Sequence, residues 1–175
     1  MRRLIVAVPL LALLALTQTD CRHRRNKAAV AEDDGQLLTI VNVADPRAAV
    51  QLTRGFYAVE ANAWRWAAKD FAVALRRPAN AAKHGARLEM KFSLPDAVYS
   101  RVGAVTVAAK INQVQLPPAT FSMAGAFTYA AEVPASALAA DTALVEFTVD
   151  KAIPPGDRDQ RELALVVLTI GLLPK

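Results

Sequence analysis

Both tryptophans of the chain lie in one short stretch, residues 55–66, beside a tyrosine, a glutamate and an arginine. Aromatic rings can stack on the C–H faces of sugar rings, while neighbouring arginine and glutamate groups hydrogen-bond the hydroxyls. The stretch therefore indicates a carbohydrate-binding site. Its candidate ligand-binding residues are Tyr57, Glu60, Trp64, Arg65 and Trp66.

The same residues have a structural interpretation. In an extended segment Trp64 and Trp66 share one face, so both indoles lie together, either inside the core or outside it. Arg65 then points the other way, and we expect it to pair with Glu60 or Asp159 as a structural clamp, or to lie over an aromatic ring. From the sequence we favour the core or clamp role and keep the binding face as the alternative.

Catalytic and cofactor motifs are absent from the sequence. It has no G-x-S-x-G elbow, H-E-x-x-H pair, glycine-rich phosphate loop or cysteine metal knuckle. The two histidines are His23, in the leader, and His84, in an expected surface turn with no nucleophile nearby in sequence. The sequence thus predicts a protein that is not an enzyme and that carries no cofactor.

The acidic loop 154–162 allows one metal hypothesis. It holds three acids within six positions, and calcium prefers six to eight oxygen ligands. Arg158 and Arg161 lie in the same loop and offer a second account, in which they neutralise the acids. We favour the second account and predict no metal site.

The amino terminus is typical of an export signal. A short positive segment precedes the apolar run Leu4–Leu16, whose 13 residues are too few for a spanning helix. Cys21 follows at the place of a lipidated cysteine, although Asp20 departs from the lipobox pattern. The basic cluster 22–27 opposes translocation of that flank, so an uncleaved membrane anchor stays open. We assign 1–31 to a signal or anchor segment with a basic linker.

The remaining chain, 32–175, is expected to form a single domain without net charge. The leader holds six of the 21 basic residues and one of the 16 acids, leaving 15 of each in the body. Nucleic-acid binding would need clustered cations in the folded part, so it is excluded as a function class. Cys21 is the only cysteine, so an apolar core alone must hold the domain.

Alternating apolar and polar residues predict an all-β fold. Residues 87–94 alternate most regularly, with Leu88, Met90, Phe92 and Leu94 on one face. Residues 64–77 also have helical spacing, but we choose a strand for 70–76. Residues 163–173 are apolar on both faces and are placed centrally between layers. The predicted strands are 37–43, 51–59, 70–76, 87–94, 105–111, 127–133, 144–149 and 163–173. This pattern predicts an antiparallel β-sandwich of jelly-roll or immunoglobulin-like type, preceded by a hydrophobic signal segment.

A resemblance supports this fold. The run Gly55-Phe56-Tyr57-x-x-Glu60-x-x-x-Trp64-Arg65-Trp66, then 71–75, then Pro154-Pro155 with Asp159-x-Arg161-x-Leu163, resembles bacterial β-sandwich modules. Those modules are similar to carbohydrate-binding domains and occur appended to glycosyltransferases and other cell-surface polysaccharide proteins. Ala164 departs from the pattern, where a glycine is expected. The resemblance implies accessory sugar recognition or scaffolding without catalysis.

Together these features predict an exported, non-catalytic module that is periplasmic, secreted or held at the cell envelope. Its expected partner is a glycan or an envelope protein, with a membrane tether through the amino terminus as an open alternative. The rival hypothesis is a structural or protein-interaction module of the envelope that has no ligand site.

Overall fold

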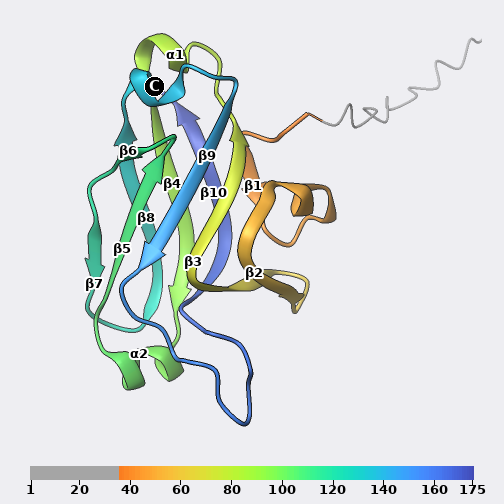
Figure 1. Cartoon of the computed structure of the whole chain (residues 1–175), viewed down its shortest axis with the longest axis vertical. Coiled ribbons are helices and arrows are strands. Elements are labelled where there is room, and N and C mark those ends of the chain that lie inside the picture. Colours follow the sequence, from red (N-terminus) through yellow and green to blue (C-terminus); the bar gives the residue numbers. More distant parts are fainter. Residues whose placement is uncertain (1–35) are drawn as a thin grey trace, which may run out of the picture. The chain divides into compact units, whose positions relative to one another are not determined.

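The structure, a computed structural model, describes residues 36–175, which are mostly antiparallel β-strand (Figure 1). The predicted signal segment, the basic linker and Cys21 lie outside the described residues, so the interpretations placed on them stay predictions. Within 36–175, no helix is both long and apolar enough to cross a membrane.

The strands follow the predicted order, with four short helical segments between them. The strands are β1 (Ile40–Asn42), β2 (Leu52–Glu60), β3 (Trp64–Arg76), β4 (Ala86–Leu94), β5 (Val105–Ile111), β6 (Val114–Gln115), β7 (Ala119–Phe121), β8 (Gly125–Val133), β9 (Thr142–Val149) and β10 (Leu165–Pro174). The helical segments are the 3-10 turns η1 (Pro46–Gln51) and η2 (Ala135–Leu138) and the helices α1 (Ala81–His84) and α2 (Asp96–Val102).

One curled sheet forms both layers of a β-sandwich. Its strand order is β6-β5-β9-β3-β10-β4-β8, with β1 on β10, β2 on β3 and β7 on β5. The long strand β3 joins the layers, because Asp70–Arg76 pair with β9 whereas Arg65–Ala67 pair with β10. The predicted antiparallel β-sandwich is confirmed.

The core lies between the layers and follows the predicted alternation. On β4, Leu88, Met90, Phe92 and Leu94 are all buried, as their spacing indicates. The opposite layer contributes alternating residues of β5 and β9, among them Phe147. Phe71 of β3 stacks on Phe147 with ring centroids 4.9 Å apart, which ties the joining strand to the core.

Strand β3 begins earlier than predicted. The sequence places a strand at 70–76 and leaves a helix open for 64–77, but the strand starts at Trp64 and runs unbroken to Arg76. The helical spacing of the apolar residues is overridden because β3 pairs with β2 along one edge and with β10 and β9 along the other.

Strand β10 is central, as predicted, but is not buried on both faces. It pairs with β4 along one edge and with β3 and then β1 along the other. Leu165, Val167 and Ile170 are fully buried, whereas Val166 is half-buried and Leu168 is 39% exposed. The apolar residues on the second face therefore have a role other than filling the core.

Helix α2 was not predicted. It is seven residues long, follows Pro95 directly and buries Val98. Seven residues are too few for a clear period of 3.6, which is why the pattern did not reveal the helix. Figure 1 shows α2 at the end of the sandwich opposite α1, next to the long connection between β9 and β10.

Candidate functional site

A surface groove forms where β2, β3, β10 and β4 lie side by side. Trp66 on β3 is paired with Val166 on β10, which is paired in turn with Ser93 on β4. Directly opposed residues of an antiparallel sheet face the same side, so these three side chains form one row on the outer face. Trp64 lies two residues away on the same face, opposite Glu60 of β2.

Both indoles face this groove, so the core interpretation favoured from the sequence holds only for the part of Trp66 that packs against the core. Trp64 and Trp66 are half-buried and absent from the set of fully buried core side chains, although Trp66 packs partly against the core. The groove has a volume of about 440 Å³. Its lining residues are Glu60, Trp64, Trp66, Ser93, Pro95, Val166 and Leu168.

The turn between β2 and β3 sets the position of Glu60 beside Trp64. Ala61 and Asn62 have φ values of 48° and 53°, and the Ala63 amide donates to the Glu60 carbonyl at 3.0 Å. Two consecutive residues with positive φ are typical of a tight hairpin turn that matches the strand twist. The turn therefore aligns the end of β2 with the start of β3.

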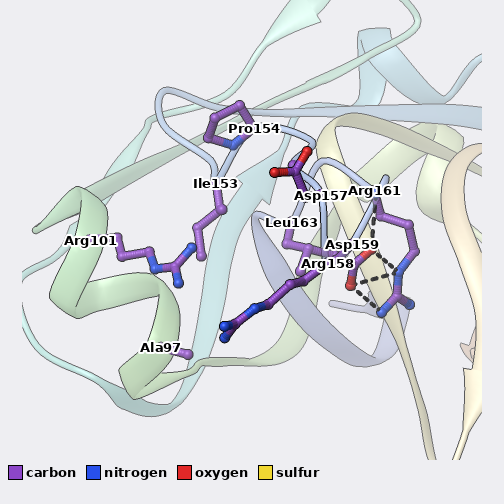
Figure 2. Close-up of a pocket in the computed structure, with 10 residues that line it drawn as sticks. Ala97, Arg101, Ile153, Pro154, Asp157, Arg158, Asp159, Arg161 and Leu163 are labelled. Atoms are coloured by element: carbon purple, nitrogen blue, oxygen red, sulfur yellow. Dashed lines mark hydrogen bonds and ion pairs between the residues drawn. The ribbon is translucent and has the colours of Figure 1, made fainter.

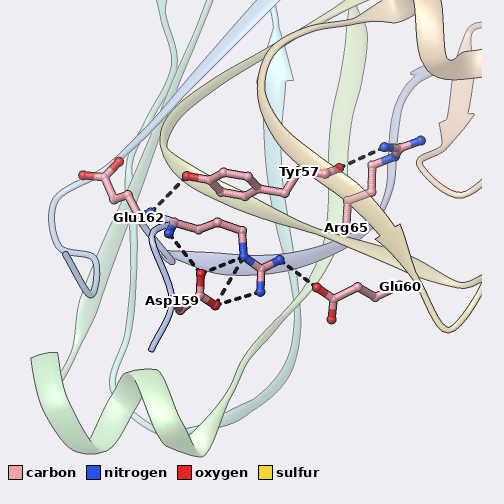
Figure 3. A network of polar contacts seen from close by, with 6 residues as sticks. Tyr57, Glu60, Arg65, Asp159 and Glu162 are labelled. Atoms are coloured by element: carbon pink, nitrogen blue, oxygen red, sulfur yellow. Dashed lines mark hydrogen bonds and ion pairs between the residues drawn. The ribbon is translucent and has the colours of Figure 1, made fainter. Parts of the chain in front are cut away.

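Arg161 connects the groove to the loop between β9 and β10 (Figure 3). Its Nη2 and Nε donate to the two carboxylate oxygens of Asp159, at 2.8 Å and 2.9 Å, and its Nη1 donates to Oε1 of Glu60 at 2.7 Å. The guanidinium carbon lies 5.5 Å from the centre of the Tyr57 ring. One cation thus holds two acids and one aromatic ring in place.

This arrangement corrects the predicted role of Arg65. Arg65 pairs with neither Glu60 nor Asp159; its Nε donates to the Val43 carbonyl at 2.6 Å and its Nη1 to the Tyr57 carbonyl at 2.9 Å. The reason is the alternation of β3, which turns Arg65 away from the face that holds Trp64 and Glu60. The clamp exists, but Arg161 forms it.

Tyr57 is a supporting residue rather than a wall of the groove. Its hydroxyl accepts a hydrogen bond from the Glu162 amide at 3.0 Å, and the Glu162 carboxylate accepts one from the Lys69 amide at 2.9 Å. Of the five predicted site residues, the structure brings Glu60, Trp64 and Trp66 to the groove. It assigns Tyr57 and Arg65 to the contacts that hold the neighbouring strands and loop.

The charges of the Arg161 cluster compensate one another. Hydrogen bonds from the Arg161 side chain and backbone lower the pKa of Asp159 to about 2. The same side-chain bond to Asp159, followed by that to Glu60, raises the pKa of Arg161. The prediction that the two loop arginines neutralise the loop acids is confirmed for Arg161 with Asp159 and is wrong for Arg158, which pairs with no acid in 36–175.

The sequence did not reveal the groove residues Ser93, Pro95, Val166 and Leu168. Val166 and Leu168 had a readable signal, because a strand that is apolar on both faces must cover one face with another element or expose it. Ser93 had none, since it is an ordinary polar position of an alternating strand.

The fold and this groove define the class: a β-sandwich protein with an aromatic groove on one outer face. No protein-family model matches the chain, and no curated protein matches it. Among solved structures, the chain is similar to TmCBM27, a carbohydrate-binding module studied for specific mannan recognition, at 14% identity and a TM-score of 0.46. The similarity covers 80% of this chain and 98% of that module. The glycosyltransferase setting implied by the sequence resemblance stays a prediction.

Proposed function

We propose that this chain is a non-catalytic module that binds carbohydrate in the groove beside Trp64 and Trp66. One observation carries the proposal: both indoles of the protein lie on the same outward face of the sheet and line the same groove. Indole faces stack on the apolar face of a sugar ring and contribute binding energy with little loss of side-chain freedom.

The rest of the groove suits a ligand of that kind. Its floor is apolar, formed by Val166, Leu168 and Pro95, and its polar groups are few. Such a lining is typical of small-molecule sites, where a few polar groups fix the orientation of the ligand. Glu60 and Ser93 supply a carboxylate and a hydroxyl for the sugar hydroxyls.

Glu60 is held ready for this task. Arg161 holds its Oε1, while Oε2 accepts no hydrogen bond from another residue in 36–175, and the side chain is 39% exposed. A side chain that is already fixed loses little conformational entropy on binding. Oε2 is therefore the acceptor that we assign to a sugar hydroxyl.

Replacing Trp64 by alanine tests the proposal. Trp64 is the better choice because Trp66 also packs against the core. We expect Trp64→Ala to weaken polysaccharide binding about tenfold, the size of about 1.4 kcal/mol of stacking. Affinity gel electrophoresis over a panel of soluble polysaccharides measures this loss, with a matching thermal unfolding curve to show that the fold is intact.

A matched leucine pair serves as the control. Leu168 and Leu144 are both 39% exposed, but Leu168 lines the groove whereas Leu144 lies on β9 in the other layer. Leu168→Ala should weaken binding and Leu144→Ala should not. If no polysaccharide held in the gel retards the migration of the wild-type protein, the proposal fails.

The apolar floor also favours one second candidate, a protein-interaction module of the envelope. Val166 and Leu168 would then be covered by an apolar segment of a partner. This candidate is supported if the wild type binds no glycan of the panel and co-purifies with an envelope protein that the Leu168→Ala variant does not retain.

Export is part of the proposal and rests on the sequence of residues 1–31. Intact-mass spectrometry of the protein made in a bacterial host distinguishes the possibilities. An acylated Cys21, a new amino terminus near residue 32 and an intact Met1 correspond to a lipid anchor, a cleaved signal and an uncleaved anchor.

A further inference from the structure

A second cavity lies beside the groove, between helix α2 and the loop 153–163 (Figure 2). Its volume is also about 440 Å³. Three arginines line it: Arg101 from α2, and Arg158 and Arg161 from the loop. We call it the arginine pocket.

Two of these arginines are available to a ligand. Arg161 is occupied by Asp159 and Glu60, whereas the guanidinium groups of Arg101 and Arg158 have no ion pair or hydrogen bond with any other residue in 36–175. Figure 2 shows both of these groups directed into the space between helix and loop. The carboxylate of Asp157 points away from them in the same view.

An anion is the ligand that this arrangement favours. Guanidinium groups present several donors in a planar fork, which matches the oxygens of a carboxylate or a sulfate ester. Asp157 and Asp159 also line the cavity, but Asp159 is paired with Arg161 and neither acid is paired with Arg101 or Arg158. An anion bound between the two arginines would therefore gain favourable charge interactions with both. The apolar side chains of Ile153 and Leu163 line the same cavity and suit the carbon skeleton that carries the anion.

The arginine pocket and the aromatic groove are neighbours. Glu60 lines the groove and is bonded at 2.7 Å to Arg161, which lines the arginine pocket. Pro95 borders the groove and Ala97, two residues further along the chain, borders the arginine pocket. A single extended ligand that lies in one cavity therefore reaches the edge of the other.

We propose that the arginine pocket binds an anionic substituent, a carboxylate or a sulfate ester, of a glycan whose adjoining sugars lie in the aromatic groove. The ligand class is then an acidic polysaccharide. This inference rests on the proposed function, because it takes the groove as the place where the sugar rings bind. Arg101 and Arg158 select the charged chain, and Trp64 and Trp66 hold its rings.

Matched pairs of glycans test the inference with the full chain. A galacturonate hexasaccharide and its methyl ester differ in charge but hardly in shape, and dextran sulfate and dextran form a second pair that reports on sulfate. We expect the wild type to bind at least one charged member about tenfold more tightly than its uncharged partner, from two exposed charge contacts of about 0.7 kcal/mol each. Raising the ionic strength should shrink this preference.

The double variant R101Q/R158Q should lose the preference and keep its affinity for the uncharged chain. The matched control is R76Q/K83Q, which removes the same charge from exposed residues at the other end of the sandwich. The inference is overturned if the wild type binds neither charged chain, or binds each no better than its partner. It is also overturned if R101Q/R158Q keeps the preference or if the control loses it equally.

Trp64→Ala separates this inference from the proposed function. Loss of affinity for charged and uncharged chains alike supports the groove, whatever the arginine variants do. A variant that keeps wild-type affinity for every chain refutes the groove as the binding site, and with it the shared ligand.

Discussion

Arg161 is the residue on which the site depends most. It joins the loop between β9 and β10 to the end of β2 through Asp159 and Glu60, over more than 100 positions of sequence in the second case. The sequence indicated a clamp in this region but assigned it to Arg65. Pairings between residues so far apart follow from the sheet topology, which local spacing does not contain.

The acid Asp159 should make stability depend on pH. Its folded-state pKa of about 2 lies below its ordinary value of 3.8, so its stabilising contribution is complete above pH 3.8 and is lost as the pH falls toward 2. We expect the difference in unfolding free energy between the wild type and Asp159→Asn to shrink over that interval. Urea titrations from pH 6 to pH 2 measure it.

Asp157→Asn is the matched control for this experiment. Asp157 lies in the same loop but has no ion pair with another residue in 36–175. If the difference in unfolding free energy between the wild type and Asp159→Asn stays constant from pH 4 to pH 2, the role assigned to the ion pair of Arg161 with Asp159 is contradicted.

Gln51 is the one polar or charged residue of 36–175 that is fully buried, and we predict that it is essential to stability. It is 1% exposed, accepts from the Leu38 amide at 2.8 Å, and donates to the carbonyls of Leu38 and Ala74 at 3.0 Å and 2.6 Å. Gln51→Met leaves buried backbone groups unpaired, which costs about 1–3 kcal/mol. Chemical denaturation measures the loss, and Gln115→Met on exposed β6 should cost less than 0.5 kcal/mol, or about the error of the method.

At the scale of elements, the strands that bury one face were predictable and the short segments were not. The alternation in 105–111 gave β5 with the right bounds, because a half-buried strand leaves a period of two in the sequence. The two-residue β6, the three-residue β7 and the seven-residue α2 are too short to leave a period, and β1 forms only over Ile40–Asn42 of the predicted strand 37–43. The outer face of β10 was predicted to be buried because its residues are hydrophobic. The sequence pattern is the same whether such residues fill a core or line a groove.

The bend of β2 around β3 depends on Gly55. This residue has φ +74°, and a Cβ atom there would lie within 2.7 Å of the Phe71 Cα and still closer to the Asp70 carbonyl oxygen. The close approach brings β2 against β3, so it also sets the position of Glu60 at the far end of the strand. Only glycine fits this combination of dihedral angle and contact.

We therefore predict that Gly55→Ala destabilises the fold by about 3 kcal/mol or more, through strain and a backbone clash. Gly103→Ala is the control, since Gly103 has nearly the same φ, +73°, and nothing within 4 Å of the added Cβ. It should cost about 1 kcal/mol from the dihedral alone. Thermal unfolding measures the stability of both variants. Equal losses of stability in Gly55→Ala and Gly103→Ala would show that the backbone clash at Gly55 contributes nothing.

At the scale of the whole molecule, the site lies where the two layers are joined. Strand β3 contributes its first half to the layer with β10 and its second half to the layer with β9. The indoles stand on the first half, and the clamp and the arginine pocket lie in the connections nearby, toward the end that carries α2 (Figure 1). The sandwich thus holds a surface built from three separate stretches of the chain, 60–66, 93–101 and 153–168.

Only part of this surface was predictable. Glu60, Trp64 and Trp66 were identified because they are close in sequence and chemically distinctive. Ser93, Arg101 and Val166 come from other parts of the chain and join them only after folding. The fold class was therefore easier to predict than the site.

Tryptophan fluorescence tests the central claim most directly, because the only two tryptophans of the protein line the proposed groove. We predict that acrylamide quenches the emission of the unliganded protein, and that a polysaccharide retained in the binding panel shifts the emission and reduces the quenching. Emission that is blue, resistant to acrylamide and unchanged by every polysaccharide would place both indoles in the interior and contradict the account.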